Sequence, residues 1–188
     1  MKKIQLLSDR LMLRNFNMDD LESVHNLLTD PKSNIYNVSD APEDKTATTS
    51  IIATWQNENI AEPRLRYTFY IETIDKQFIG LISIGIIKIK YQNADVWYKI
   101  CPGFWGKGYA TEALNTIIKF GFEDLKLHRI GAGCATANIA SYKVLEKAGM
   151  LREAHTRKLL PLKSGWSDNY EYAILEEDYF KSINILPN

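Results

Sequence analysis

The residue types best suited to bind a phosphate gather in one short stretch, Trp105-Gly106-Lys107-Gly108-Tyr109-Ala110-Thr111, where helix-forming residues begin. Glycine permits a tight turn and lets an anion approach the backbone, because no Cβ stands in the way. A helix that begins here leaves unpaired N–H groups, and its dipole adds partial positive charge. Both features favour a phosphate or pyrophosphate. Residues 105–111 therefore either bind a phosphorylated ligand or form a tight connection without one.

The glycine spacing differs from the two commonest phosphate-binding motifs. A Walker A loop requires Gly-x-x-x-x-Gly-Lys-Ser/Thr, and a dinucleotide fingerprint requires Gly-x-Gly-x-x-Gly. In this chain Gly106-Lys107-Gly108 leads into Tyr109-Ala110-Thr111, which fits neither motif. The sequence therefore predicts neither a Walker-type loop nor a dinucleotide fingerprint at this turn.

A second group of polar residues begins the helix expected over residues 139–148. Asn138 precedes that helix and fits the N-cap position, where its side chain would satisfy free N–H groups. Ser141 shares one helix face with Leu145 and Ala148, which lie four and seven positions further on. A hydroxyl on an apolar face requires a partner. That partner is either its own backbone one turn earlier or a group that enters from the sheet.

The composition excludes several classes of protein. The chain has 188 residues, of which 23 are basic and 23 acidic, and its formal net charge is zero. Nucleic-acid and membrane-surface binders usually carry a basic surplus, so we expect neither partner. No apolar run approaches the roughly 20 residues that span a bilayer, and the first residues lack the apolar segment of a secretion signal. The two cysteines, Cys101 and Cys134, fit neither a zinc site nor a disulfide framework and indicate a reducing cytoplasm.

The hydrophobic pattern predicts one α/β domain over residues 1–188. Strands are expected at residues 10–14, 67–74, 78–88, 94–100, 129–136, 152–160 and 166–175, and helices at 17–29, 46–57, 109–125 and 139–148, with a final helical turn or two after 176. The longest helix connects strands 94–100 and 129–136, which we therefore expect to run parallel. The sheet should be mixed, with antiparallel strands early and late in the chain and a parallel pair in the middle.

Three motifs carry a family resemblance. Residues 105–110 match Gln/Arg-x-x-Gly-x-Gly/Ala, with Trp105 in the Gln/Arg place; residues 138–150 form a second motif, and Arg157, Trp166 and Asp168 a third. In this order they resemble the pyrophosphate motif, the second motif and the final hairpin of the Gcn5-related N-acetyltransferase (GNAT) superfamily, in its branch of ribosomal-protein N-terminal acetyltransferases. The resemblance implies an α/β (α+β) GNAT fold, whose mixed, mostly antiparallel sheet has a central splayed pair of parallel strands and flanking helices.

The resemblance implies direct transfer of an acetyl group from acetyl-coenzyme A (acetyl-CoA) to an amine, without a metal. The backbone N–H groups near Tyr98 and Ile100 would polarise the thioester carbonyl, an oxyanion-type role. Lys147 would meet the adenosine phosphate or, in a second interpretation, is a solvated lysine on the helix surface. The full set of expected cofactor-binding residues is Tyr98, Ile100, Trp105, Gly106, Lys107, Gly108, Tyr109, Ala110, Thr111, Asn138, Ser141 and Lys147.

Two side chains are assigned to proton handling. Ser141 would assist departure of the CoA thiolate, because Leu145 stands where many family members carry a tyrosine for that role. The alternative is departure of the thiolate with water as the proton source. Asp95 matches an acidic position of the family's central strand and either takes the ammonium proton through water or is a structural carboxylate. We also expect a cross-strand ion pair between Arg157 and Asp168.

The resemblance leaves three interpretations of what the site serves. The ribosomal-protein branch points to a protein N-terminus as the acceptor. A small diffusible amine, such as a polyamine or an aminoglycoside, is the first alternative, and a non-catalytic CoA-binding sensor is the second. The segments that would select the acceptor, residues 31–63 and the final hairpin, carry no recognisable code. The oligomeric state is equally open, a homo-oligomer included.

Overall fold

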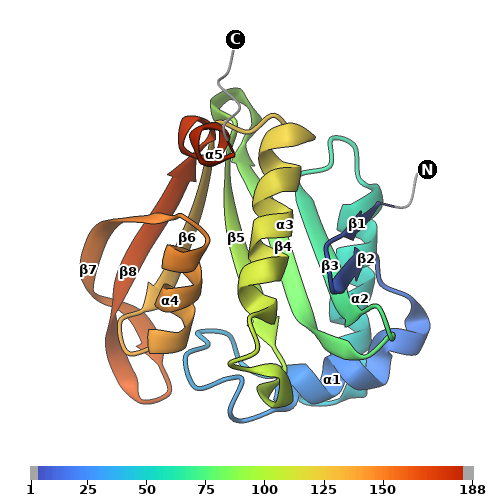
Figure 1. Ribbon diagram of the computed structural model, residues 1–188. Helices are drawn as coiled ribbons and strands as arrows, with labels where there is room; N and C mark the ends of the chain where they lie inside the picture. The colour runs from blue at the N-terminus through green and yellow to red at the C-terminus, as the bar shows by residue number, and fades with distance from the viewer. Residues whose placement is uncertain (1–3, 184–188) are drawn as a thin grey trace.

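One mixed sheet forms the centre of the computed structural model, which describes residues 4–183 (Figure 1). Its strands are β1 (Gln5–Leu7), β2 (Leu11–Arg14), β3 (Arg66–Thr73), β4 (Phe78–Lys88), β5 (Asn93–Ile100), β6 (Arg129–Ala135), β7 (Leu151–Leu162) and β8 (Gly165–Leu175). Their order across the sheet is β1-β2-β3-β4-β5-β6-β8-β7. The neighbours β5 and β6 run parallel, and the other neighbouring strands run antiparallel. This arrangement confirms the predicted fold class, although β1 was too short to give a periodic signal.

Helices cover both faces of this sheet. They are α1 (Leu21–Thr29), α2 (Lys45–Ile60), α3 (Tyr109–Glu123), α4 (Ile139–Lys147) and α5 (Glu176–Ser182), and 3₁₀ turns lie at Met18–Asp20, Ile89–Tyr91 and Pro102–Phe104. In Figure 1 the helices α3 and α4 lie in front of the sheet, and α2 lies behind it. One buried cluster joins α3 and α4 to the sheet, and a second joins α1 and α2 to the opposite face.

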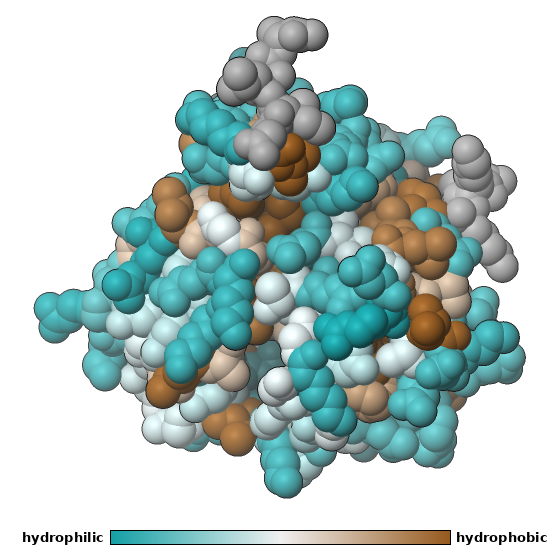
Figure 2. Space-filling view, in the orientation of Figure 1, coloured by the Kyte–Doolittle hydropathy of each residue, from teal (hydrophilic) through white to brown (hydrophobic). Residues whose placement is uncertain are grey.

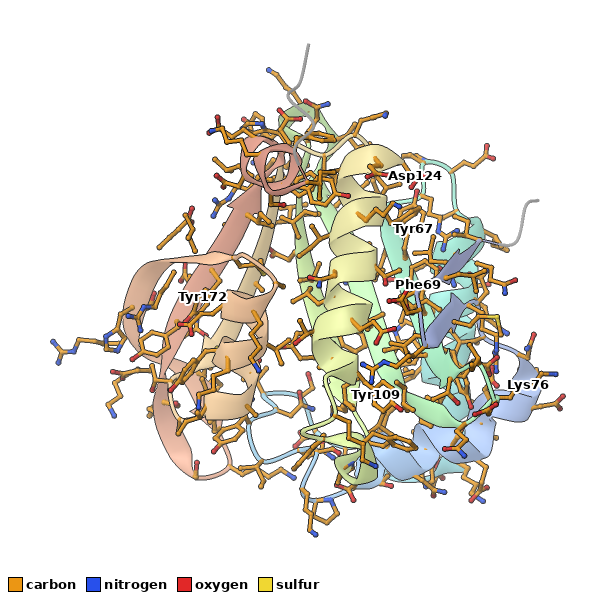
Figure 3. The ribbon with its side chains drawn as sticks, in the orientation of Figure 1. Tyr67, Phe69, Lys76, Tyr109, Asp124 and Tyr172 are labelled. Atoms are coloured by element: carbon orange, nitrogen blue, oxygen red, sulfur yellow. The ribbon has the colours of Figure 1, made fainter. Side chains whose placement is uncertain are left out.

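Close packing of α3 fixes its place over the central strands. Tyr67 and Phe69, labelled in Figure 3, meet the ring of Phe120 with centroid distances of 5.3 and 6.1 Å. Gly121 lets the helix approach the sheet, since a Cβ there would lie 2.6 Å from Ile130. The residues that begin α3 are therefore held at a fixed distance from β5 and β6.

The two parallel strands separate part-way along their length. Their pairing covers three residues of each strand and ends where Asp95 lies opposite Gly131. Beyond this point β5 remains paired with β4 as far as Ile100, whereas β6 remains paired with β8 as far as Ala135. The central sheet therefore opens into a wedge, as the predicted splayed pair requires.

One prediction about the final hairpin is wrong, because Arg157 and Asp168 do not form an ion pair. The carboxylate of Asp168 contacts His155 Nε2 at 2.8 Å and accepts from the backbone N–H of Lys158 at 3.0 Å. The register between β7 and β8 shifts after Thr156, so Arg157 lies in an irregular segment. A register shift changes which side chains share a face, and the sequence pattern gave no sign of it.

Three further observations concern the surface, the length of the helices and the first residues of the chain. Hydrophobic residues appear in Figure 2 as separate patches among hydrophilic ones on the face that α3 and α4 cover. Within residues 4–183, no helix is both long and apolar enough to cross a bilayer. The first three residues, on which the expectation about a secretion signal partly depends, lie outside the described residues.

Candidate active site

A cavity of about 380 Å³ occupies the wedge between β5 and β6. Its walls come from β5, β6, α4, the β7–β8 hairpin and the loop of residues 30–44, which lies below the gap between α4 and α3 in Figure 1. The lining residues are Tyr36, Asn37, Val38, Val96, Trp97, Tyr98, Ala132, Gly133, Cys134, Ala135, Asn138, Ser141, Leu145, Leu160 and Asn169. None of them carries a carboxylate, a lysine amine or a guanidinium group.

The cavity reaches both faces of the sheet, because successive side chains of a strand point in opposite directions. Tyr98 belongs to the cluster under α3 and α4, whereas its neighbour Trp97 packs with the cluster under α1 and α2. On β6, Cys134 lies on the first face and Gly133 on the second. One wall therefore faces α4 and the other faces the loop of residues 30–44.

Backbone N–H groups of β5 point into the wedge at the positions expected from the sequence. The N–H of Cys101 donates to Ile79 on β4 at 2.8 Å. Because the direction of the N–H alternates along a strand, those of Tyr98 and Ile100 point away from β4. No strand pairs with this edge of β5 beyond Asp95 within the described residues. The edge can therefore donate hydrogen bonds to a ligand in the wedge.

The glycine turn has the geometry expected of an anion-binding site. Gly106 and Gly108 have φ angles of +74° and +82°, which side chains other than glycine rarely adopt. No side chain of the described residues caps the first turn of α3, so its N–H groups stay free for a ligand. The indole of Trp105 donates to the carbonyl of Ile100 at 2.7 Å and thereby ties the turn to β5.

Arg10 braces this turn, a contact that sequence reasoning missed. Its guanidinium donates to Glu112 on α3 at 2.7 Å and to the carbonyl of Lys107 at 3.2 Å, and it lies 4.5 Å from the ring of Tyr109. Figure 3 labels Tyr109 at the end of α3 where the turn begins. The pairing of Arg10 with Glu112 spans 102 positions of sequence and leaves no local pattern to detect.

The N-terminal turn of α4 carries a polar cluster. Asn138 accepts from the backbone N–H of Ser141 at 3.2 Å, which confirms its predicted N-cap position. The Ser141 hydroxyl lies 3.0 Å from the phenol oxygen of Tyr98, which also donates to the Ser141 carbonyl at 3.2 Å. Burial raises the pKa of Cys134 to about 11 and the pKa of Tyr98 well above its usual value. Both groups are therefore protonated near neutral pH.

The remaining predicted residues lie outside the cavity. Asp95 stands at the last paired position of β5, on the face opposite Tyr98, and burial raises the pKa of its carboxyl although Arg129 and Arg66 oppose the shift. Lys107 is exposed and donates to the carbonyl of Gly103 at 2.9 Å. Lys147 is exposed in the last turn of α4, while Ala110 and Thr111 lie in the first turn of α3.

The wall opposite α4 depends on one asparagine that sequence reasoning also missed. The amide oxygen of Asn34 accepts from Lys99 Nζ at 2.6 Å and from Asn37 at 3.3 Å, and its amide nitrogen donates to Leu28 and Asp30 carbonyls at 2.7 and 2.9 Å. Burial lowers the pKa of Lys99 to about 8, and no carboxylate pairs with it among the described residues. Asn34 therefore connects β5 to the loop that lines the cavity.

Comparison with known proteins finds this architecture along nearly the whole chain. The family model described as "Acetyltransferase (GNAT) domain" matches residues 10–151. The N-acetyltransferase YnaD of Bacillus subtilis, itself uncharacterized, is 31% identical over 180 residues, which are 94% of this chain and 99% of YnaD.

The fold is also found in solved structures. A GNAT-family acetyltransferase from Bacillus anthracis is 31% identical, with a TM-score of 0.81 over 93% of this chain and 99% of that one. Spermidine N-acetyltransferase from Vibrio cholerae, solved with CoA and spermine, has a TM-score of 0.82 at 24% identity, over 92% of this chain and 99% of that one. At that identity the second likeness is one of fold.

Proposed function

Because this chain belongs to the GNAT acetyltransferase family, we propose that it acetylates the N-terminal amine of a polypeptide. Acetyl transfer to nitrogen is the activity of the family, and the chain is an acyltransferase of this kind. One observation carries the choice of acceptor, namely that no charged side chain of residues 4–183 lines the cavity. A neutral wall suits a single amine on a neutral chain, because further ammonium groups would lose hydration without gaining a counter-charge.

The residues present fit acetyl-CoA, which when bound supplies a thioester carbonyl for the amine to attack. The free N–H groups of the turn at Gly106–Gly108 and of the first residues of α3 suit its pyrophosphate. The N–H groups of Tyr98 and Ile100 would hold the carbonyl oxygen as negative charge develops on it. Lys147, exposed at the end of α4, would meet the adenosine phosphate.

The reaction requires removal of a proton from the acceptor and stabilisation of the departing sulfur. The acceptor enters as an ammonium and must lose a proton before its nitrogen forms the new C–N bond. We assign that proton to Asp95 through water, since burial raises the pKa of this carboxyl above its usual value and makes it a stronger base. The C–S bond then breaks and sulfur leaves as thiolate. The Ser141 hydroxyl would stabilise that thiolate as a hydrogen-bond donor.

The rim of the cavity supports a polypeptide acceptor. Val38 lines the cavity and is 52% exposed, and Leu159, next to the lining residue Leu160, is 46% exposed. Trp166, on the same β7–β8 hairpin as Leu159, is 63% exposed. Apolar and aromatic side chains at a rim suit contact with a protein surface.

A small amine remains the second candidate, because a specific feature favours it. The loop of residues 30–44 is tied to β5 through Asn34, and its residues Tyr36, Asn37 and Val38 form a wall of the cavity on the side opposite α4, so that a small amine could be enclosed there. The spermidine acetyltransferase of Vibrio cholerae shares this fold and was solved with spermine. The cytoplasmic location and the oligomeric state expected from the sequence stay predictions.

The deciding experiment measures thiol release from acetyl-CoA against a matched panel of amines. We expect turnover with peptides that bear a free N-terminus, and none with the same peptides blocked at that amine. Preferential turnover of spermidine or an aminoglycoside would replace the proposed acceptor by a small amine. Tight binding of acetyl-CoA without turnover on any amine would indicate the sensor interpretation.

A further inference from the structure

The geometry points to Tyr98 as the residue that positions the Ser141 hydroxyl toward the departing thiolate. This inference rests on the proposed function, because it concerns how the same site stabilises the leaving group. Tyr98 comes from β5 and Ser141 from α4, so the contact joins the two sides of the wedge. Tyr98 acts through Ser141 and is therefore a positioning residue.

Both hydrogen bonds of the Tyr98 phenol are formed with Ser141. The Tyr98 hydroxyl lies 3.0 Å from Ser141 Oγ and 3.2 Å from the Ser141 carbonyl oxygen, and it has no other hydrogen-bond partner among the described residues. Burial raises the pKa of the phenol, which keeps its proton on the oxygen near neutral pH. The phenol has a single proton, which points at Ser141 and is shared between its carbonyl oxygen and its hydroxyl oxygen in a three-centre hydrogen bond.

A donating phenol leaves the serine proton free for another acceptor. A helical serine usually bonds back to the carbonyl four residues earlier, but no such bond forms here among the described contacts. When Ser141 Oγ accepts from Tyr98, its own O–H becomes a stronger donor, because hydrogen bonds in a chain polarise one another. That O–H is then available to a sulfur atom in the wedge.

Ser141 and the buried thiol of Cys134 belong to the same wall of the wedge. Burial raises the pKa of the Cys134 thiol to about 11, so this thiol stays neutral near neutral pH. Both residues line the cavity. Leu145, one turn further along α4, is 1% exposed and brings no polar atom to this wall. Ser141 is therefore the residue of α4 that brings a hydroxyl to this wall.

The role is hydrogen bonding without proton transfer. A thiol ionises near pH 8.5, far more readily than an alcohol, so the thiolate does not remove the serine proton. The C–N bond forms, the C–S bond breaks, and the electron pair of that bond stays on sulfur. Tyr98 and Ser141 each keep their proton while the Ser141 O–H points at the new charge.

The test is a double-mutant cycle built from Tyr98→Phe and Ser141→Ala. Loss of one hydrogen bond lowers kcat by about two- to ten-fold for Tyr98→Phe, with the Kd of acetyl-CoA unchanged. Ser141→Ala lowers kcat at least as much. Because Tyr98 acts through Ser141, adding Tyr98→Phe to Ser141→Ala causes no further loss. Tyr142→Phe is the matched control, since that ring packs on Tyr170 at 6.1 Å and should leave kcat unchanged.

A second readout needs no turnover. The ultraviolet absorbance of the thiolate gives the pKa of the thiol in bound CoA as the pH is raised. We expect Tyr98→Phe and Ser141→Ala to raise this pKa by similar amounts, because each removes the donor from the thiolate. Melting temperatures verify that every variant is folded.

The possible results separate this inference from the proposed function. Additive losses of kcat in the double variant, or an unchanged thiol pKa in Tyr98→Phe, overturn the role of Tyr98. If Ser141→Ala alone lowers kcat and raises the thiol pKa, the donor to sulfur stands but Tyr98 does not position it. If the wild type acetylates no amine, the proposed function fails, whereas the thiol titration still decides whether Tyr98 directs the serine.

Discussion

The two walls of the cavity are built in different ways. The wall toward α3 and α4 is formed by the free backbone edge of β5 and the capped helix α4, and next to it lies the turn whose two glycines, Gly106 and Gly108, have positive φ angles. The wall opposite is a loop, residues 30–44, that depends on the side-chain bonds of Asn34. Backbone geometry suits the binding of acetyl-CoA, which is used in every turnover. A loop held by side-chain hydrogen bonds can change its shape through few substitutions.

This difference predicts two classes of variant. Changes in the wall toward α3 and α4 should alter the binding of acetyl-CoA for every acceptor. Changes around Asn34 should alter the acceptor and leave acetyl-CoA binding intact.

The largest effect is expected at the glycine turn. Gly108 has a φ of +82°, and a Cβ there would lie 3.4 Å from the guanidinium of Arg10. In Gly108→Val, strain and bulk would remove two or three hydrogen bonds to the pyrophosphate, each worth about 1 kcal/mol, so affinity should fall on the order of 100-fold. Calorimetry with acetyl-CoA measures it.

Gly103→Val provides the matched control for this substitution. Gly103 lies just before the turn, its φ is not positive, and a Cβ added to it would have no other atom within 4 Å. The control should bind acetyl-CoA nearly as the wild type does. Equal affinity in folded Gly108→Val would contradict the assignment of the turn to the pyrophosphate.

Substitution of Arg10, which contacts the same turn, should weaken the binding of acetyl-CoA less. In Arg10→Met, the carboxylate of Glu112 stays in the first turn of α3 without its cation, and it would repel a pyrophosphate at that helix end. We expect about ten-fold weaker binding of acetyl-CoA, roughly 1.4 kcal/mol. Adding Glu112→Gln should restore part of the affinity. If the double variant binds acetyl-CoA no better than Arg10→Met does, Arg10 supports the turn through its packing and not through its charge.

The sequence revealed the first wall more completely than the second for a physical reason. A glycine turn, an N-cap and a helical stripe are local patterns, so the turn at residues 105–111, the N-cap position of Asn138 and the helix face of Ser141 could be predicted before the fold was known, whereas their roles toward acetyl-CoA stay predictions. The pairing of β5 with β6 followed from the connecting helix. In each case neighbouring residues determine the geometry.

Contacts distant in sequence escaped prediction. Arg10 with Glu112 and Asn34 with Lys99 are separated by 102 and 65 positions, so no local period links them. The bulge after Thr156 shifted the register of the last hairpin and paired Asp168 with His155. The sequence therefore predicted the elements and the turn, and the fold was needed for the side chains that brace them.

The third expected effect concerns the acceptor wall. Asn34→Ala removes the acceptor of Lys99 and the bonds to the Leu28 and Asp30 carbonyls, so the loop beside the cavity loses its anchor. We expect the KM for the acceptor amine to rise about three- to ten-fold, as loss of one or two hydrogen bonds predicts. The KM for acetyl-CoA should not change, and bisubstrate kinetics separate the two constants.

Lys99→Met tests the same wall from the side of the strand. It keeps the apolar stem of the side chain but removes the amine that donates to Asn34. It should raise the acceptor KM in the same direction as Asn34→Ala. A rise confined to the KM for acetyl-CoA would show that the two walls are not independent.

The smallest effect is expected outside both walls, at the pair of His155 and Asp168. Asp168→Asn keeps an oxygen that accepts from the backbone N–H of Lys158 but loses the ionic contact with His155, which is 51% exposed. Neither residue lines the cavity, so kcat and both KM values should stay unchanged. The melting temperature at neutral pH should fall only slightly, because exposed ion pairs contribute little.

The pH dependence of this small loss can be worked out from one carboxyl. The hydrogen bond from the Lys158 backbone, followed by that from His155, lowers the pKa of Asp168 in the folded state below its usual 3.8. The unfolded state then binds more protons around that value, so this stabilisation is present above pH 3.8 and disappears as the pH falls through the folded pKa. Melting temperatures of wild type and Asp168→Asn should therefore differ at neutral pH and converge in acid. A variant that loses turnover while its melting temperature holds would instead give Asp168, the neighbour of the lining residue Asn169, a role in the acceptor wall, because a pair that acts only on stability cannot lower turnover in a fully folded variant.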